Sequence, residues 1–196
     1  MQWTELKPDA HVEEAPSLFA VLDCVSAIRC HANLVRGAHL YVLRDCAERI
    51  MRHVASDSKE VGGLLLGRVW MYKGAGNGAA IPLVFILDAV ASTANHHTSV
   101  SLEMGTDVWN SANARASGPV LVVGWYHSHP NLGAFFSATD RNTQQAFFTN
   151  PYSVGWVIDP VRNEEKVFLG KHSEEYRRQL VRLRREPDWL PNAAAE

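Results

Sequence analysis

The chain alternates between two patterns of hydrophobic and polar residues. In the first pattern, apolar side chains recur at helical spacing with arginine, glutamate or other polar residues between them, which predicts amphipathic helices. The segments with this pattern are residues 43–56, 106–118 and 137–149. The second pattern is a short, mostly apolar run rich in β-branched residues, which predicts buried strands. The runs of this kind are residues 25–28, 39–43, 60–72, 81–92, 119–126, 152–161 and 165–170.

Strands and helices that alternate in this way predict the α/β fold class, with a mixed β-sheet flanked by helices. The glycine-rich residues 73–78 include Asn77-Gly78, which favours a hairpin turn between two of the strands. They lack the spacing of a phosphate-binding loop.

The pattern divides the chain into three parts. Residues 1–36 form an N-terminal extension, whose first 16 residues we expect to be irregular, and residues 37–172 form the domain. Residues 173–196 predict a basic amphipathic helix and tail, in which Tyr176, Leu180 and Leu183 share one stripe. A solvated basic face on a docking helix is the preferred interpretation of its arginines, and binding of RNA or a partner is the alternative.

Composition narrows the classes of partner. A chain of 196 residues with 46% hydrophobic content can bury one ordinary core. Nineteen basic against 21 acidic residues give a net charge of −2, which favours neither nucleic acid nor a membrane as a partner. Cys24, Cys30 and Cys46 are odd in number and show no C-x-x-C spacing. With no secretory signal pattern, we expect a cytoplasmic protein with reduced, buried thiols.

Candidate chemistry lies in residues 124–140, GWYHSHPNLGAFFSATD. Residues two apart in a strand point to the same face, so His127 and His129 can direct both imidazoles at one point, as half of a tetrahedral zinc site. Pro130 cannot donate to a sheet and should end the strand there. Taken alone, an H-x-H pair is more often explained by surface or core histidines.

Two interpretations of Ser137 and Asp140 are open. In one, both belong to a capping box at the start of a helix and are structural. In the other, Asp140 is a third metal ligand and Ser137 donates a hydrogen bond to the substrate, which leaves a fourth metal position for water. Such a site also needs a proton-transferring carboxylate. Spacing does not choose among Asp57, Glu60, Asp88, Glu103 and Asp107.

The order H-x-H-P-x(6)-S-x-x-D resembles the signature of the JAMM (MPN+, or JAB) metalloprotease family. VVGWYHSHP, NTQQ and VIDP are similar to its proteasome-lid deubiquitinase-like members, and the resemblance covers residues 37–171. It implies a cytidine deaminase-like three-layer fold and one zinc ion held by His127, His129 and Asp140. The segment EVGGLLLG resembles the one that carries the family's catalytic glutamate, so Glu60 is expected to act as general base and acid. Ser137 is expected to stabilise the oxyanion.

The resemblance implies a zinc isopeptidase that removes ubiquitin or a ubiquitin-like modifier from conjugates, and a dimer is compatible with it. Residues 131–136 depart from the proteasome-lid pattern, which puts the substrate preference in doubt. The family's first insertion maps to residues 92–100, where His96 and His97 are expected to be exposed loop residues. The interval 149–153 is too short for the family's second insertion, so a single zinc ion is expected.

Two other functions compete with this one. The first is a peptidase that processes a sulfur-carrier protein with a ubiquitin-like fold. The second is a non-catalytic MPN scaffold, although such members have lost ligands and this chain has the full set. A single MPN-like unit without obvious ubiquitin-binding appendages favours a stand-alone bacterial enzyme of a ubiquitin-like conjugation pathway, with antiviral defence as a candidate setting.

Overall fold

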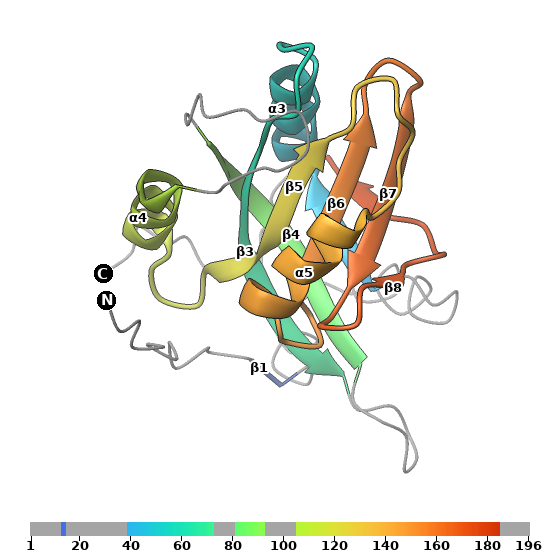
Figure 1. The fold of residues 1–196 in the computed structure, drawn as a ribbon. Coiled ribbons are helices and arrows are strands. Elements are labelled where there is room, and N and C mark those ends of the chain that lie inside the picture. The colour runs from blue at the N-terminus through green and yellow to red at the C-terminus, as the bar shows by residue number, and fades with distance from the viewer. Residues whose placement is uncertain (1–12, 15–38, 73–80, 93–104, 185–196) are drawn as a thin grey trace.

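The computed structural model describes residues 13–14, 39–72, 81–92 and 105–184. Within them lies a mixed sheet of nine strands in the order β8-β7-β6-β5-β3-β4-β2-β9, with β1 paired to β3 off this path (Figure 1). The strands are β1 Glu13–Glu14, β2 Leu40–Leu43, β3 Gly62–Tyr72, β4 Ile81–Ala91, β5 Leu121–Ser128, β6 Val154–Asp159, β7 Glu164–Leu169, β8 Glu174–Glu175 and β9 Val181–Leu183. The helices are α3 Arg44–Val54, α4 Thr106–Arg115 and α5 Ala138–Phe147.

Helices cover both faces of the sheet. Successive residues of a strand point to opposite faces, and β3 shows this directly. Leu65 belongs to a buried cluster with Ile50 of α3. Leu64 belongs to a second cluster with Val108 of α4, and this cluster also includes Trp125. Because α5 also contacts Trp125, α4 and α5 lie on one face and α3 lies on the other. The α/β mixed sheet flanked by helices is confirmed.

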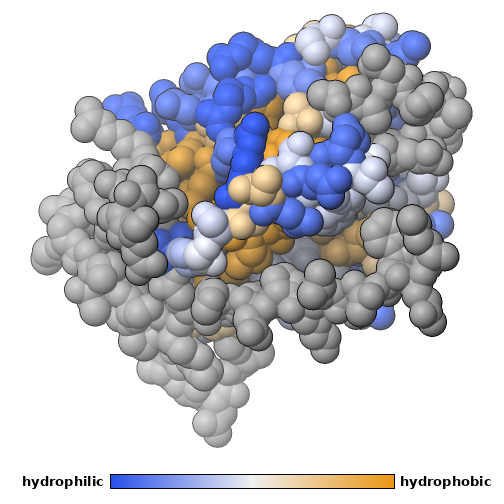
Figure 2. Space-filling model, turned by 90° about the vertical axis from the view of Figure 1, so that its left-hand side faces the viewer, coloured by the Kyte–Doolittle hydropathy of each residue, from blue (hydrophilic) through white to orange (hydrophobic). Residues whose placement is uncertain are grey.

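The amphipathic pattern of α4 places this helix at the surface. Val108 and Ala112 are buried, whereas Asp107 and Asn110 are exposed. Figure 2 views the molecule from the side on which α4 lies in Figure 1, and hydrophilic residues there stand in front of a hydrophobic layer. Among the described residues, none of the helices has the length and apolar content needed to cross a membrane.

Most of the predicted elements are confirmed within the described residues. Cys46 is buried, as expected, and burial raises the pKa of its thiol to about 12, so it remains an uncharged apolar group. Cys24, Cys30, the strand at 25–28, the turn at 73–78 and the insertion with His96 and His97 lie outside the described residues. One difference concerns the N-terminal residues, where the pair Glu13–Glu14 forms a short parallel strand against β3.

The predicted C-terminal helix is wrong for residues 173–184. Two short strands replace it: β8 pairs with β7, and β9 pairs in parallel with β2. Two residues of the predicted stripe instead fix this segment to the domain. Leu180 is buried in the same cluster as Ile50 of α3, and the Tyr176 hydroxyl accepts a hydrogen bond from the His39 N–H at 3.1 Å. The reason is that β2 has backbone groups to satisfy on this edge, a requirement that local periodicity does not reveal.

Leu180→Ala should therefore cost about 2–5 kcal/mol in free energy of unfolding, because a buried leucine leaves a cavity. Gln179→Ala, at the exposed neighbouring position, should change it by less than about 0.5 kcal/mol. Chemical denaturation of both variants measures the difference. Equal, small effects would mean that this segment does not pack as described.

Candidate metal centre

The end of β5 positions two histidines at the rim of the sheet. His127 lies on β5, which ends at Ser128, and His129 follows with its N–H donated to the Ile158 carbonyl oxygen at 2.9 Å. Pro130 has no N–H to continue the ladder. Both histidines are buried, with exposed fractions of 1% and 3%. Asp140 is brought to them by the first turn of α5, directly after the N-cap residue Ser137.

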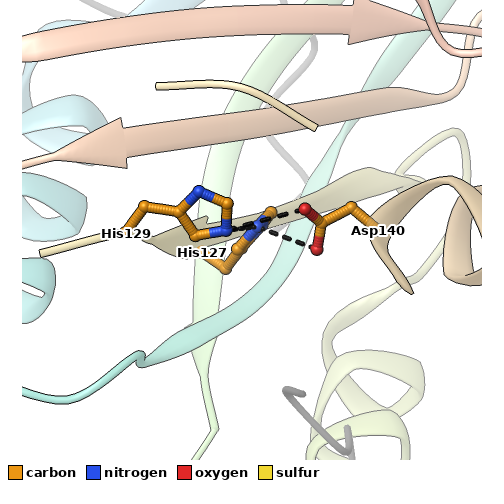
Figure 3. Close-up of side chains that lie close together, drawn as sticks. All are labelled: His127, His129 and Asp140. Carbon is orange, nitrogen blue, oxygen red and sulfur yellow. Dashed lines mark hydrogen bonds and ion pairs between the residues drawn. The ribbon is translucent and has the colours of Figure 1, made fainter. Parts of the chain in front are cut away.

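The three side chains point toward one another (Figure 3). The Nε2 atoms of His127 and His129 are 3.1 Å apart. The His127 Nε2 lies 3.1 Å from Asp140 Oδ1, and the His129 Nε2 lies 3.6 Å from Asp140 Oδ2. A tetrahedral ion with zinc–nitrogen bonds of about 2.0–2.1 Å separates its ligand atoms by about 3.3 Å. The spacings between the side chains are close to this value, and among the described residues these three form the group that could hold a metal, with one ligand atom from each within 4.8 Å of the others.

Protonation states also suit metal binding. Burial opposes ionisation of Asp140, but hydrogen bonds from His127 and Ser137 outweigh it and lower the pKa of the carboxyl to about 2. Burial, reinforced by the neighbouring His127, lowers the pKa of His129. A carboxylate that is ionised and an imidazole that is neutral at neutral pH are the forms that bind a metal.

The capping box predicted for Ser137 and Asp140 is present, and Asp140 also contacts the two histidines. Ser137 Oγ accepts a hydrogen bond from the Asp140 N–H at 3.2 Å, and Asp140 Oδ2 accepts one from the Ser137 N–H at 2.7 Å. Asp140 Oδ1 is the oxygen that faces His127. The two interpretations left open by the sequence are thus compatible, because each carboxylate oxygen can serve one of them. Accepting at the cap also leaves the Ser137 hydroxyl its proton to donate.

Glu60 lies beside this group, just before β3, with its Oε1 atom 3.7 Å from the His129 Nε2. Burial raises its pKa. The other carboxylates considered from the sequence are placed differently. Asp88 pairs with arginines of α3 and α4, Asp57 accepts from the Lys59 N–H, and Asp107 is exposed on α4. Glu103 lies outside the described residues.

Sequence reasoning missed the polar residues that support the site. Ser128, between the two histidines, is fully buried, and its Oγ accepts a hydrogen bond from the Val61 N–H at 3.0 Å, next to Glu60. Asp159 is also fully buried and accepts from four backbone N–H groups, including those of residues 131 and 133 after His129. The sequence feature that could have indicated Ser128 is its position between the two histidines, on the opposite face of the strand. The only such feature for Asp159 is its position at the end of a buried apolar run.

The segment that departs from the proteasome-lid pattern forms a wall of the site. The ring of Phe135 lies 4.9 Å from that of His129, and 45% of the residue is exposed. Leu132, in the same segment, is 57% exposed. An apolar surface therefore lies next to one of the metal-ligand candidates.

Comparison with known proteins gives short local matches to curated relatives and two longer matches, one to a solved structure and one to a family model. The 26S proteasome regulatory subunit rpn11 of Schizosaccharomyces pombe is 50% identical over 46 residues, or 23% of this chain and 15% of that protein. The ubiquitin carboxyl-terminal hydrolase RPN11 of Saccharomyces cerevisiae is 38% identical over 71 residues, or 34% of this chain and 23% of that protein. The matches thus span less than a quarter of either relative.

The two longer matches cover most of the domain. A solution structure of a protein from Desulfitobacterium hafniense has a TM-score of 0.54 and 19% identity, and the match covers 74% of this chain and 94% of that one. At this identity it supports the fold alone. The model of the family described as prokaryotic homologs of the JAB domain matches residues 43–179. Since this is well over half of the sequence, the chain belongs to the JAB/MPN family, which includes the JAMM metalloproteases.

Proposed function

We propose that this protein is a zinc-dependent isopeptidase that removes ubiquitin or a ubiquitin-like modifier from conjugates. The observation that carries the proposal is the convergence of two imidazole nitrogens, 3.1 Å apart, on the Asp140 carboxylate, whose Oδ1 lies 3.1 Å from His127 and whose Oδ2 lies 3.6 Å from His129. A fourth side chain, Glu60, lies 3.7 Å from the His129 nitrogen. Membership of the JAB/MPN family and the similarity to RPN11 support it. RPN11 is named as a ubiquitin carboxyl-terminal hydrolase in yeast.

Each residue has a role in the proposed reaction. His127, His129 and Asp140 would hold zinc, which when bound polarises the scissile carbonyl and lowers the pKa of water. Glu60 accepts the proton of the attacking water and delivers it to the leaving amine, and its raised pKa suits both transfers. The Ser137 hydroxyl donates a hydrogen bond to the negative charge that develops on the carbonyl oxygen.

Metal removal tests the proposal. The purified protein is offered lysine-linked conjugates and linear fusions of ubiquitin-like proteins, before and after dialysis against a chelator, and product is measured by gel densitometry. Cleavage of lysine-linked conjugates that is lost with the chelator and restored by one equivalent of zinc is expected. Cleavage of linear fusions alone would favour the sulfur-carrier peptidase instead. No cleavage with zinc fully bound would favour the scaffold.

Ser137 variants separate its two roles. Ser137→Ala and Ser137→Gly both remove the donor, so each should lower kcat by about 10²–10³-fold. Their stabilities should differ, because alanine at an N-cap costs about 1 kcal/mol whereas glycine costs a few tenths. Steady-state kinetics and thermal unfolding give the two quantities. Equal kcat in the glycine variant and the wild type would leave Ser137 with the structural role alone.

A further inference from the structure

Gln144 is a buried polar residue that the proposed reaction does not use. It lies on α5 four residues after Asp140, so both side chains share one face of the helix. Gln144 is fully buried, at 0% exposure. An amide in such a place needs partners for its donors and acceptor, since an unsatisfied buried polar group is costly.

The partners of Gln144 come from three different segments. Its Oε1 accepts a hydrogen bond from Trp125 Nε1 at 2.7 Å. Its Nε2 donates to the carbonyl oxygens of Ser153 and Gly170 at 3.3 and 3.2 Å. These bonds connect α5 with β5, with the segment before β6 and with the residue after β7. One side chain thus fixes the helix that carries Asp140 against the strands.

Gln144 also contacts the candidate ligand His127 indirectly, through Trp125. The indole of Trp125 stacks on the imidazole of His127 with ring centroids 4.5 Å apart and planes 7° from parallel. Metal-binding histidines are commonly oriented by a hydrogen bond to the other ring nitrogen. The Nδ1 atom of His127, however, is buried with no hydrogen-bond partner among the described residues. The stack on Trp125 is therefore a contact that orients the plane of this ring where the usual Nδ1 hydrogen bond is missing among the described residues.

We infer that Gln144 is a positioning residue that couples two metal ligands, holding Asp140 through α5 and His127 through Trp125. The inference rests on the proposed zinc site and assigns its preorganisation to one amide. The hydrogen-bond partners of Gln144 are Trp125, Ser153 and Gly170, none of which is a candidate metal ligand. Its loss should weaken the binding of zinc, since outer partners of metal ligands typically contribute about 10–100-fold in affinity.

Zinc affinity, measured by competition with a chromogenic chelator, tests this inference without reference to catalysis. Gln144→Leu should raise the zinc dissociation constant by about 10–100-fold. The matched control is Tyr126→Phe, which removes a hydrogen bond of 2.9 Å to His53 on the other face of the same strand. The control should bind zinc as the wild type does, even if it unfolds at a lower temperature. An equal loss of affinity in both variants would mean general destabilisation and overturn the inference.

A second variant guards against poor folding of Gln144→Leu. Trp125→Phe keeps an aromatic ring over His127 but removes the Nε1–H, which donates a hydrogen bond to Gln144 Oε1. Its zinc affinity should fall, and the double variant should be no weaker than Gln144→Leu, because linked residues are not additive. Independent, additive losses would overturn the coupling. Wild-type protein that binds no zinc would instead refute the proposed function, whereas unchanged affinity in both variants would refute the positioning role alone.

Discussion

Glu60→Gln is expected to lower kcat by about 10²–10⁴-fold while one zinc ion per chain is retained. Glutamine has nearly the same shape as glutamate but cannot accept or deliver a proton. Glu60 Oε1 lies 3.7 Å from the His129 Nε2 and is not among the three grouped ligands, so the metal site should survive the change. Steady-state cleavage of a lysine-linked conjugate, together with metal analysis of the same sample, measures both quantities.

The control for this variant is Asp57→Asn. Asp57 lies on the same segment before β3, is exposed and accepts a hydrogen bond from the Lys59 N–H, which asparagine can still receive. Its kcat should equal that of the wild type. If Glu60→Gln retained more than a tenth of the wild-type kcat, another group would have to move the proton.

Asp140→Asn is expected to abolish stoichiometric zinc binding. The loss of zinc affinity should be larger than that caused by removing a residue that only supports a ligand, which is about 10–100-fold. The reason is that the neutral amide replaces the ionised carboxylate whose Oδ1 lies 3.1 Å from the His127 Nε2. Cleavage should disappear with the metal. Metal analysis after gel filtration and the cleavage assay provide the measurements.

Comparison with Asp140→Ala separates the metal role of Asp140 from its capping role. The asparagine oxygen can still accept from the Ser137 N–H, a bond of 2.7 Å in the wild type, whereas alanine cannot. Measured without metal, the asparagine variant should therefore be the more stable of the two, while both lack zinc. Wild-type zinc affinity in Asp140→Asn would leave the capped helix as the only role of this residue.

The candidate site shows which parts of a centre can be predicted from one sequence. The shared direction of His127 and His129 was within reach because strand alternation is a local rule. Asp140 stayed open between a helix cap and a metal ligand until the resemblance assigned it to the metal. Glu60 was one carboxylate among five until the resemblance singled it out, since its approach to the histidines depends on the pairing of β3 with β5. The role of Gln144 in connecting three segments could not be predicted, because its hydrogen-bond partners are distant in the sequence and no periodic pattern indicates them.

The fold also has parts that local sequence patterns predict and parts that depend on distant pairing. The central strands and the three helices followed from apolar runs and periodicity, because each buries a face that its own sequence defines. The structure of residues 173–184 did not follow from the pattern. The spacing of Tyr176, Leu180 and Leu183 fits one helical stripe, but it fits equally well three residues that make separate contacts. What decides between them is the edge of β2, far away in the sequence, with which β9 pairs.

The pairing of β9 with β2 has a consequence for synthesis on the ribosome. Translation delivers β2 early, yet the strand that completes its edge, residues 181–183, emerges after every other described element. Until then, none of the other described strands pairs with this edge of β2, and an open strand edge is the kind of surface on which aggregation begins. The segments that bring His127, His129 and Asp140 together are complete before that edge closes, so local assembly of the centre can precede final closure of the sheet.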